Sequence, residues 1–73
     1  MSNMILTGNG CPACADLKRA LDSLVDVGIE VIWHNLQEDG VVETDVPVRS
    51  IPTLVIDGKV KATGLDNILE ELI

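Results

Sequence analysis

The sequence predicts one α/β domain, with a strand, a helix and a strand in its first half and two strands and a helix in its second. Three observations carry this prediction: apolar runs of strand length, apolar residues at helical spacing, and an Asp-Gly dipeptide between two strand-like runs. The chain has 73 residues, 47% of them hydrophobic, which is enough for one core and too few for two domains.

The first half predicts a strand at residues 3–7, a helix at 12–27 and a strand at 29–36. Apolar residues recur at helical spacing along 12–27, Pro12 suits the first turn of a helix, and Gly28 suits its end. A β-branched, mostly apolar run follows at 29–36. A strand, a helix and a second strand within about thirty residues predict a right-handed, parallel βαβ unit.

The segment at residues 37–49 is the least regular part of the prediction. It combines several acidic side chains with Gly40 and Pro47, both of which interrupt regular structure. The segment therefore leaves room for at most a turn or two of helix, around residues 41–44.

The second half ends in a hairpin and a helix. Residues 53–56 are apolar and predict a strand, and residues 59–63 predict the strand that returns. The intervening Asp57-Gly58 is a strong signal for a two-residue hairpin turn. At residues 66–73 the apolar side chains share one helical face, so we expect a final amphipathic helix.

The composition excludes several classes of function. The net charge is −7, from 12 acidic and 5 basic residues, so the chain repels nucleic-acid phosphates and anionic membranes. Trp33 is its one aromatic residue, too few for a base-stacking platform. No apolar run approaches the ~20 residues of a membrane span, and the N-terminus has no signal-peptide pattern. We expect a monomer in a bacterial, archaeal or phage-infected host cytoplasm, without nucleic-acid or membrane partners.

Both cysteines lie in one tetrapeptide, Cys11-Pro12-Ala13-Cys14. A disulfide across so short a loop would stabilise the fold by only about 2 kcal/mol, against ~4.7 for a 100-residue loop, so the spacing indicates redox exchange or metal binding. Cys11 falls at the N-cap of the predicted helix, where the helix dipole lowers the pKa of a thiol below its usual value of about 8.5. We predict Cys11 as the attacking nucleophile and the more buried Cys14 as the resolving thiol.

Metal binding is the main alternative for the cysteine pair. A tetrahedral zinc site needs four ligands, and the other nitrogen or sulfur donors are His34 and two methionines. We expect His34 to be an exposed or half-buried strand residue, and Trp33 to pack in the core or at its edge. Two thiolates alone could bind Cu(I), but small copper-carrying domains with this motif end in a strand, whereas this chain ends in a predicted helix. No metal site is therefore predicted.

Several motifs together resemble the thioredoxin and glutaredoxin superfamily. They are Cys11-Pro12-Ala13-Cys14 opening the first helix, Ile51-Pro52-Thr53 opening a strand, the Asp-Gly hairpin, and Gly64 with Asp66 at the last helix. The resemblance covers nearly the whole chain. It implies a minimal thioredoxin-like fold, with a four-stranded mixed sheet in the order 2-1-3-4 and the third strand antiparallel to its neighbours. The family's second helix would be short or absent.

The resemblance also implies a substrate groove. The Ile51–Pro52 peptide bond would be cis and lie against the cysteine pair, and Ile51, Pro52 and Thr53 would shape the groove. Pro12 and Ala13 would complete the active-site loop.

Further residues match positions that bind glutathione or move protons in the superfamily. Gly64, Asp66 and Asn67 resemble the turn that holds glutathione in glutaredoxins, and Arg49 could add a positive charge. These four residues are candidate contacts for glutathione or substrate. The first strand lacks the buried acid of many thioredoxins, so Thr7 or water would handle the proton.

The function that the resemblance implies is thiol-disulfide exchange. Cys11 would attack a protein disulfide, and Cys14 would then displace the reduced substrate. We expect no cofactor beyond the redox-active Cys11–Cys14 disulfide, a reductase or glutathione as electron donor, and a disulfide-containing protein such as ribonucleotide reductase as substrate. Two alternatives stay open: a Cu(I)- or Zn(II)-binding, metallochaperone-like module, and a redox-inactive adaptor that binds through the groove beside Pro52.

Overall fold

The computed structural model describes residues 3–23 and 30–72. Its elements follow the predicted order of a βαβ half and a ββα half. Neither described helix is long and apolar enough to cross a membrane. The elements are β1 (Asn3–Thr7), α1 (Pro12–Asp22), β2 (Val31–Asn35), β3 (Thr53–Ile56), β4 (Lys59–Thr63) and α2 (Leu65–Leu72).

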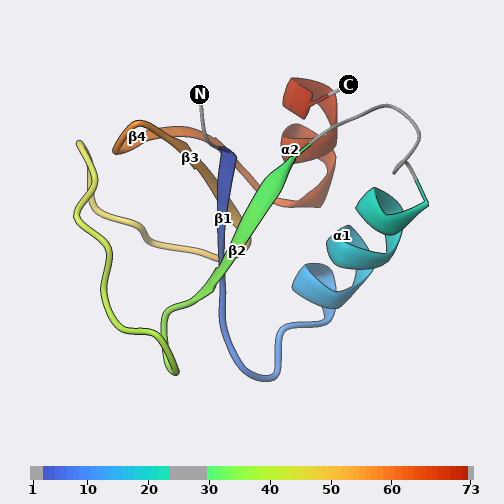
Figure 1. Ribbon diagram of the computed structural model, residues 1–73, viewed down its shortest axis with the longest axis horizontal. Helices are drawn as coiled ribbons and strands as arrows, with labels where there is room; N and C mark the ends of the chain where they lie inside the picture. Colours follow the sequence, from blue (N-terminus) through green and yellow to red (C-terminus); the bar gives the residue numbers. More distant parts are fainter. Residues whose placement is uncertain (1–2, 24–29, 73) are drawn as a thin grey trace.

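The four strands form one mixed sheet in the order β2-β1-β3-β4, as predicted (Figure 1). Strands β1 and β2 are parallel, with Thr7 opposite Asn35 at their carboxyl ends. Strand β3 is antiparallel to both β1 and β4, and Thr53 at its start lies opposite Leu6. The loop after β1, the turn after β2 and the residues before β3 therefore meet at one end of the sheet.

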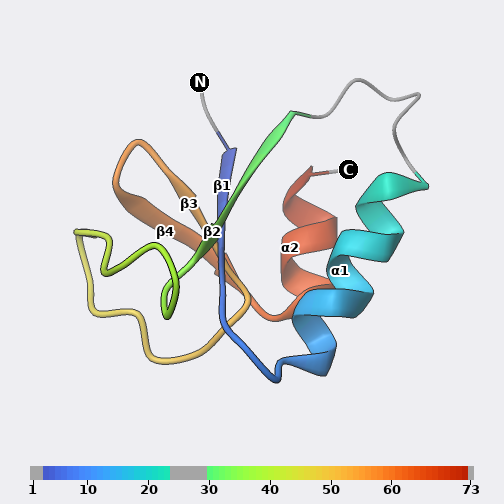
Figure 2. The same ribbon diagram turned by 60° about the horizontal axis from the view of Figure 1, so that its bottom comes forward.

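Both helices pack on the same face of this sheet (Figures 1 and 2). The core between them consists of Ile5 from β1, Leu54 from β3, Leu17 from α1 and Ile68 from α2, all with no exposed surface. Burying an aliphatic side chain of this size stabilises a fold by about 1.5–3 kcal/mol. These four aliphatic side chains therefore form the fully buried centre of the packing between the two helices and the sheet.

The opposite face is covered by residues 36–52, which form no helix. Side chains alternate along a strand, so Leu6 and Val55 point to this face, and both are buried. Asp45 fastens the segment to the β3–β4 hairpin, because its Oδ1 accepts the Val60 N–H at 2.9 Å and its own N–H donates to the Gly58 carbonyl at 2.8 Å. An irregular, hydrogen-bonded segment therefore covers this face, where the resemblance implies a second helix that is short or absent.

Four element ends differ from the sequence prediction. Helix α1 was expected to reach Val27, but it ends at Asp22 with Ser23 as its C-cap. The Ser23 hydroxyl donates to the Ala20 carbonyl at 2.7 Å, a side-chain bond that competes with continued helix. The expected stop at Gly28 lies outside the described residues. Strand β2 begins at Val31, with Glu30 outside it, and ends one residue before the predicted end. Helix α2 begins one residue early.

The β3–β4 hairpin forms at the predicted dipeptide. Asp57 has a φ of 54° and Gly58 a φ of 78°, so both turn residues are left-handed. A two-residue type I′ turn requires this conformation because its twist matches that of the flanking strands. The local signal in the sequence therefore fixes the β3–β4 connection.

Leu17→Ala should lower the free energy of unfolding by about 2–5 kcal/mol, because Leu17 is fully buried between α1 and the sheet and the change leaves a cavity. Urea denaturation followed by circular dichroism measures it. The exposed Lys61→Ala should change stability by no more than about 0.5 kcal/mol. A Leu17→Ala loss as small as that of the control would contradict the packing described.

Candidate active site

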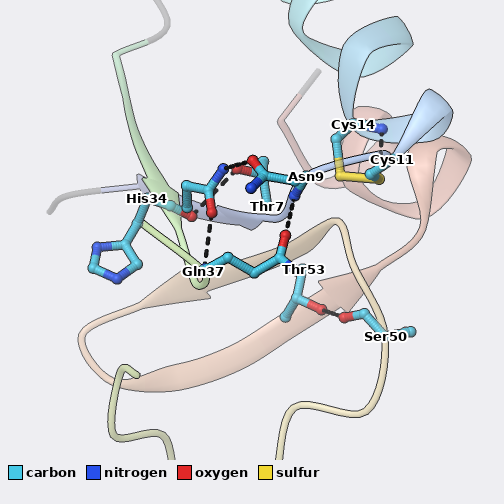
Figure 3. Close-up of a disulfide and its surroundings, with 9 residues drawn as sticks. Thr7, Asn9, Cys11, Cys14, His34, Gln37, Ser50 and Thr53 are labelled. Carbon is cyan, nitrogen blue, oxygen red and sulfur yellow. Dashed lines mark hydrogen bonds between the residues drawn. A yellow bond between two sulfur atoms is a disulfide. The ribbon is translucent and has the colours of Figure 1, made fainter. Parts of the chain in front are cut away.

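Cys11 and Cys14 form a disulfide at the N-terminus of α1, with their Cα atoms 5.3 Å apart (Figure 3). Cys11 has extended backbone angles and is the N-cap residue, and Pro12 occupies the first helical position, as the sequence predicts. Cys14 is buried with 6% of its surface exposed, whereas Cys11 is only half-buried. An incoming disulfide therefore meets Cys11 first.

The environment of Cys11 favours a negative charge on its sulfur. The Cys14 N–H donates to Cys11 Sγ at 3.1 Å. The unpaired amides at the start of α1 also place the positive end of the helix dipole at this sulfur. Both effects stabilise the thiolate once the disulfide is reduced, which is the form that attacks other disulfides.

The residues before β3 contact the loop that leads into Cys11. The Ile51–Pro52 peptide bond is cis. The Ile51 side chain packs on Gly8 so closely that a Cβ at Gly8 would lie 2.7 Å from Ile51 Cδ1. Thr53 is fully buried and donates from its hydroxyl to the Ser50 carbonyl at 2.6 Å, so it holds the turn rather than presenting a surface. Ile51 therefore lies against the loop that leads into Cys11.

A cluster of side-chain amides fixes that loop to the turn after β2 (Figure 3). Gln37 Oε1 accepts the Asn9 N–H, and Asn35 Nδ2 donates to Asn9 Oδ1 at 3.0 Å. Asn35 Oδ1 in turn accepts the Gln37 N–H at 2.8 Å. Sequence reasoning missed this cluster. Its signal was the position of Asn9 just beyond the first predicted strand and of Asn35 near the end of the second, in two strands predicted to be parallel.

The candidate glutathione contacts fall at and near the start of α2, apart from Arg49. Gly64 has a φ of 87°, and its N–H donates to the Pro52 carbonyl at 2.9 Å, which brings it beside Pro52. Asp66 is exposed in the first turn of α2, and Asn67 Nδ2 donates to the Thr63 carbonyl at 2.9 Å. Arg49 is exposed. Their contact with glutathione or substrate stays a prediction.

Trp33 of β2 lines the groove beside the cysteine pair. It packs against the core, as predicted, and it also lines an open groove of about 550 Å³ together with Cys11, Cys14 and Thr7. Lys18 lines the same groove, with its Nζ 5.7 Å from the centre of the Trp33 ring. The sequence could not reveal this contact, because it depends on the β1–β2 register that sets Trp33 opposite Ile5.

His34 is a half-buried strand residue, as predicted. Its Nε2 donates to the Gly40 carbonyl at 2.8 Å, and its ring points away from the sulfur atoms (Figure 3). Within residues 3–23 and 30–72, no three or more His, Cys, Asp or Glu side chains gather in a group that could hold a metal ion. His34 therefore anchors the turn after β2.

Comparison with known families gives one finding. A family model described as a thioredoxin domain matches residues 1–73. Neither the curated proteins nor the solved structures contain a significant match to the chain.

Limiting iodoacetamide at neutral pH should alkylate Cys11 of the reduced protein before Cys14, because Cys11 is the more exposed cysteine and its sulfur accepts the Cys14 N–H. Mass spectrometry of tryptic peptides locates the label. Preferential labelling of Cys14 would reverse the assignment of roles.

Asn35→Ala should lower the free energy of unfolding by about 1–2 kcal/mol, because it removes the hydrogen bonds to Asn9 and to the Gln37 N–H. Asn67→Ala is the matched control, since it deletes the single bond to the Thr63 carbonyl at α2. Urea denaturation compares the two variants. An Asn35→Ala loss no larger than the control's would refute a stabilising role for the cluster.

Proposed function

Because the chain belongs to the thioredoxin-domain family, we propose that it is a dithiol-disulfide oxidoreductase that reduces protein disulfides through Cys11 and Cys14. The observation that carries the proposal is the position of Cys11, a half-buried N-cap sulfur that accepts the Cys14 N–H. Such a sulfur is both reachable and stabilised as a thiolate, the two properties that an attacking thiol needs.

The reaction begins with the reduced pair. The Cys11 thiolate attacks one sulfur of the substrate disulfide, an S–S bond forms to Cys11, and the other substrate sulfur leaves as a thiolate and is protonated by water. Cys14 then loses its proton and attacks Cys11 Sγ, which releases the second substrate thiolate. The substrate gains two electrons, and the protein ends with the Cys11–Cys14 disulfide.

The proton of Cys14 needs an acceptor at the second step. The groove beside the pair is open, and Thr7 lines it. The Thr7 hydroxyl makes a long, 3.4 Å contact with the His34 carbonyl, which leaves its oxygen able to accept a hydrogen bond. Water in the groove, oriented by Thr7, is the proposed acceptor.

An external donor must return two electrons to the disulfide. A reductase or glutathione would fill this role in a reducing cytoplasm, and ribonucleotide reductase is one disulfide-containing protein that such a system would serve. Gly64, whose N–H donates to the Pro52 carbonyl, resembles the glycine of the turn that holds glutathione in glutaredoxins, so glutathione is a donor worth testing.

Metal carriage and redox-inactive binding are the competing functions. A zinc site would need four ligands, and the residues described by the structure offer no third donor beside the two cysteines. Two thiolates suffice for Cu(I), so copper binding is the stronger metal rival. An adaptor that only binds partners would work without either sulfur.

The wild-type protein should catalyse the reduction of insulin by dithiothreitol, and Cys11→Ser should abolish catalysis because it removes the attacking sulfur. Cys14→Ser should accumulate a mixed disulfide on Cys11, seen by non-reducing electrophoresis and mass spectrometry. Asp22→Ser, an exposed change at the far end of α1, is the control and should retain activity. Absence of catalysis combined with stoichiometric Cu(I) or Zn(II) binding would contradict the proposal.

A further inference from the structure

The groove beside the cysteine pair extends beyond the atoms that react. Besides Cys11 and Cys14, the groove is lined by Lys18 of α1 and Trp33 of β2. We call the part lined by these two side chains the Lys18–Trp33 groove. The disulfide exchange described above uses neither side chain.

Lys18 lies one helical turn from Cys14 and two turns from Cys11, the attacking cysteine. Cys11 and Lys18 are seven residues apart, which puts them on one helix face with a rise of about 10 Å between them. An extended peptide rises about 6.6 Å over two residues, and side chains two positions apart point to the same side. For a substrate peptide that runs along α1 from Cys11, a residue two positions from its cysteine would cover about 6.6 Å of this rise. Its side chain and that of Lys18, which leans toward the start of the helix, would span the rest.

The groove carries a positive charge in an acidic protein. Among the described residues that line it, Lys18 is the one that carries a charge, although the net charge of the chain is −7. The ion pair found within residues 3–23 and 30–72 joins the neighbouring Arg19 to Asp16 at 3.7 Å. Lys18 is instead placed with its Nζ 5.7 Å from the centre of the Trp33 ring.

We propose that the Lys18–Trp33 groove binds a carboxylate side chain two positions from the reacting cysteine of the substrate, so that Lys18 sets a preference for acidic disulfide segments. This inference rests on the proposed oxidoreductase function. A basic residue would meet a like charge at Lys18, on a ring face that the Lys18 ammonium already occupies. The net charge acts against acidic substrates at long range, but salt screens it beyond about 8 Å, so Lys18 decides the preference at contact.

The test uses peptides that differ only in charge. Each contains one cysteine, is linked to a second copy of itself by a disulfide, and carries Glu, Gln or Lys two positions to either side of the cysteine. Pre-reduced protein is mixed with each peptide, and chromatography of the released peptide thiol gives the second-order rate constant. Wild type, Lys18→Glu and Lys61→Glu are compared, because the last makes the same change of net charge on β4.

We expect the wild type to react fastest with the Glu peptide. Lys18→Glu should lower the ratio of Glu to Lys rate constants by about ten-fold, since an exposed ion pair and an exposed like-charge pair each change a rate by up to about five-fold. Lys61→Glu should leave the ratio within about two-fold of wild type.

Two results would overturn the proposal. One is a wild-type ratio of one or below, and the other is an equal fall in the ratio for both variants, which would mean that overall charge governs the rate. Failure of the proposed function itself looks different. In that case the reduced wild type would react neither with any of the peptides nor with the uncharged bis(2-hydroxyethyl) disulfide. Both proposals would then fall together.

Discussion

The parallel pairing of β1 with β2 is the constraint on which the site depends. Because Thr7 lies opposite Asn35, the two strands finish at the same end of the sheet. The loop that leads to Cys11 therefore begins beside the turn that carries Gln37. The amides of Asn9, Asn35 and Gln37 can bond only in this register. A shift by one residue would also move Trp33 to the other face, since side chains alternate along a strand. The same pairing therefore positions the nucleophile and builds the groove beside it.

The two faces of the sheet are covered in different ways. On one face α1 and α2 cover Ile5 and Leu54 with aliphatic side chains. On the other face the irregular residues 36–52 cover Leu6 and Val55, held by hydrogen bonds such as those of Asp45. The same segment leads directly to the cis Ile51–Pro52 bond, and Ile51 contacts Gly8 in the loop before Cys11.

Local signals in the sequence were sufficient for most of the fold and for the cysteine pair. The strands, the Asp57-Gly58 turn and the N-cap position of Cys11 each depend on a few adjacent residues, so their patterns could be read directly. The strand order came from a family resemblance. The end of α1 was wrong because the Ser23 hydroxyl competes for a helix carbonyl, and the amide cluster and the approach of Trp33 were missed because both depend on strand register.

The central claim is that the Cys11–Cys14 disulfide is a reactive centre that cycles between oxidised and reduced forms. Its reduction potential, measured by equilibration with glutathione or dithiothreitol redox buffers, tests this claim most directly. The account predicts a potential between about −270 and −200 mV, the range of thioredoxins and glutaredoxins. A potential below about −300 mV, which is typical of structural disulfides, would contradict it.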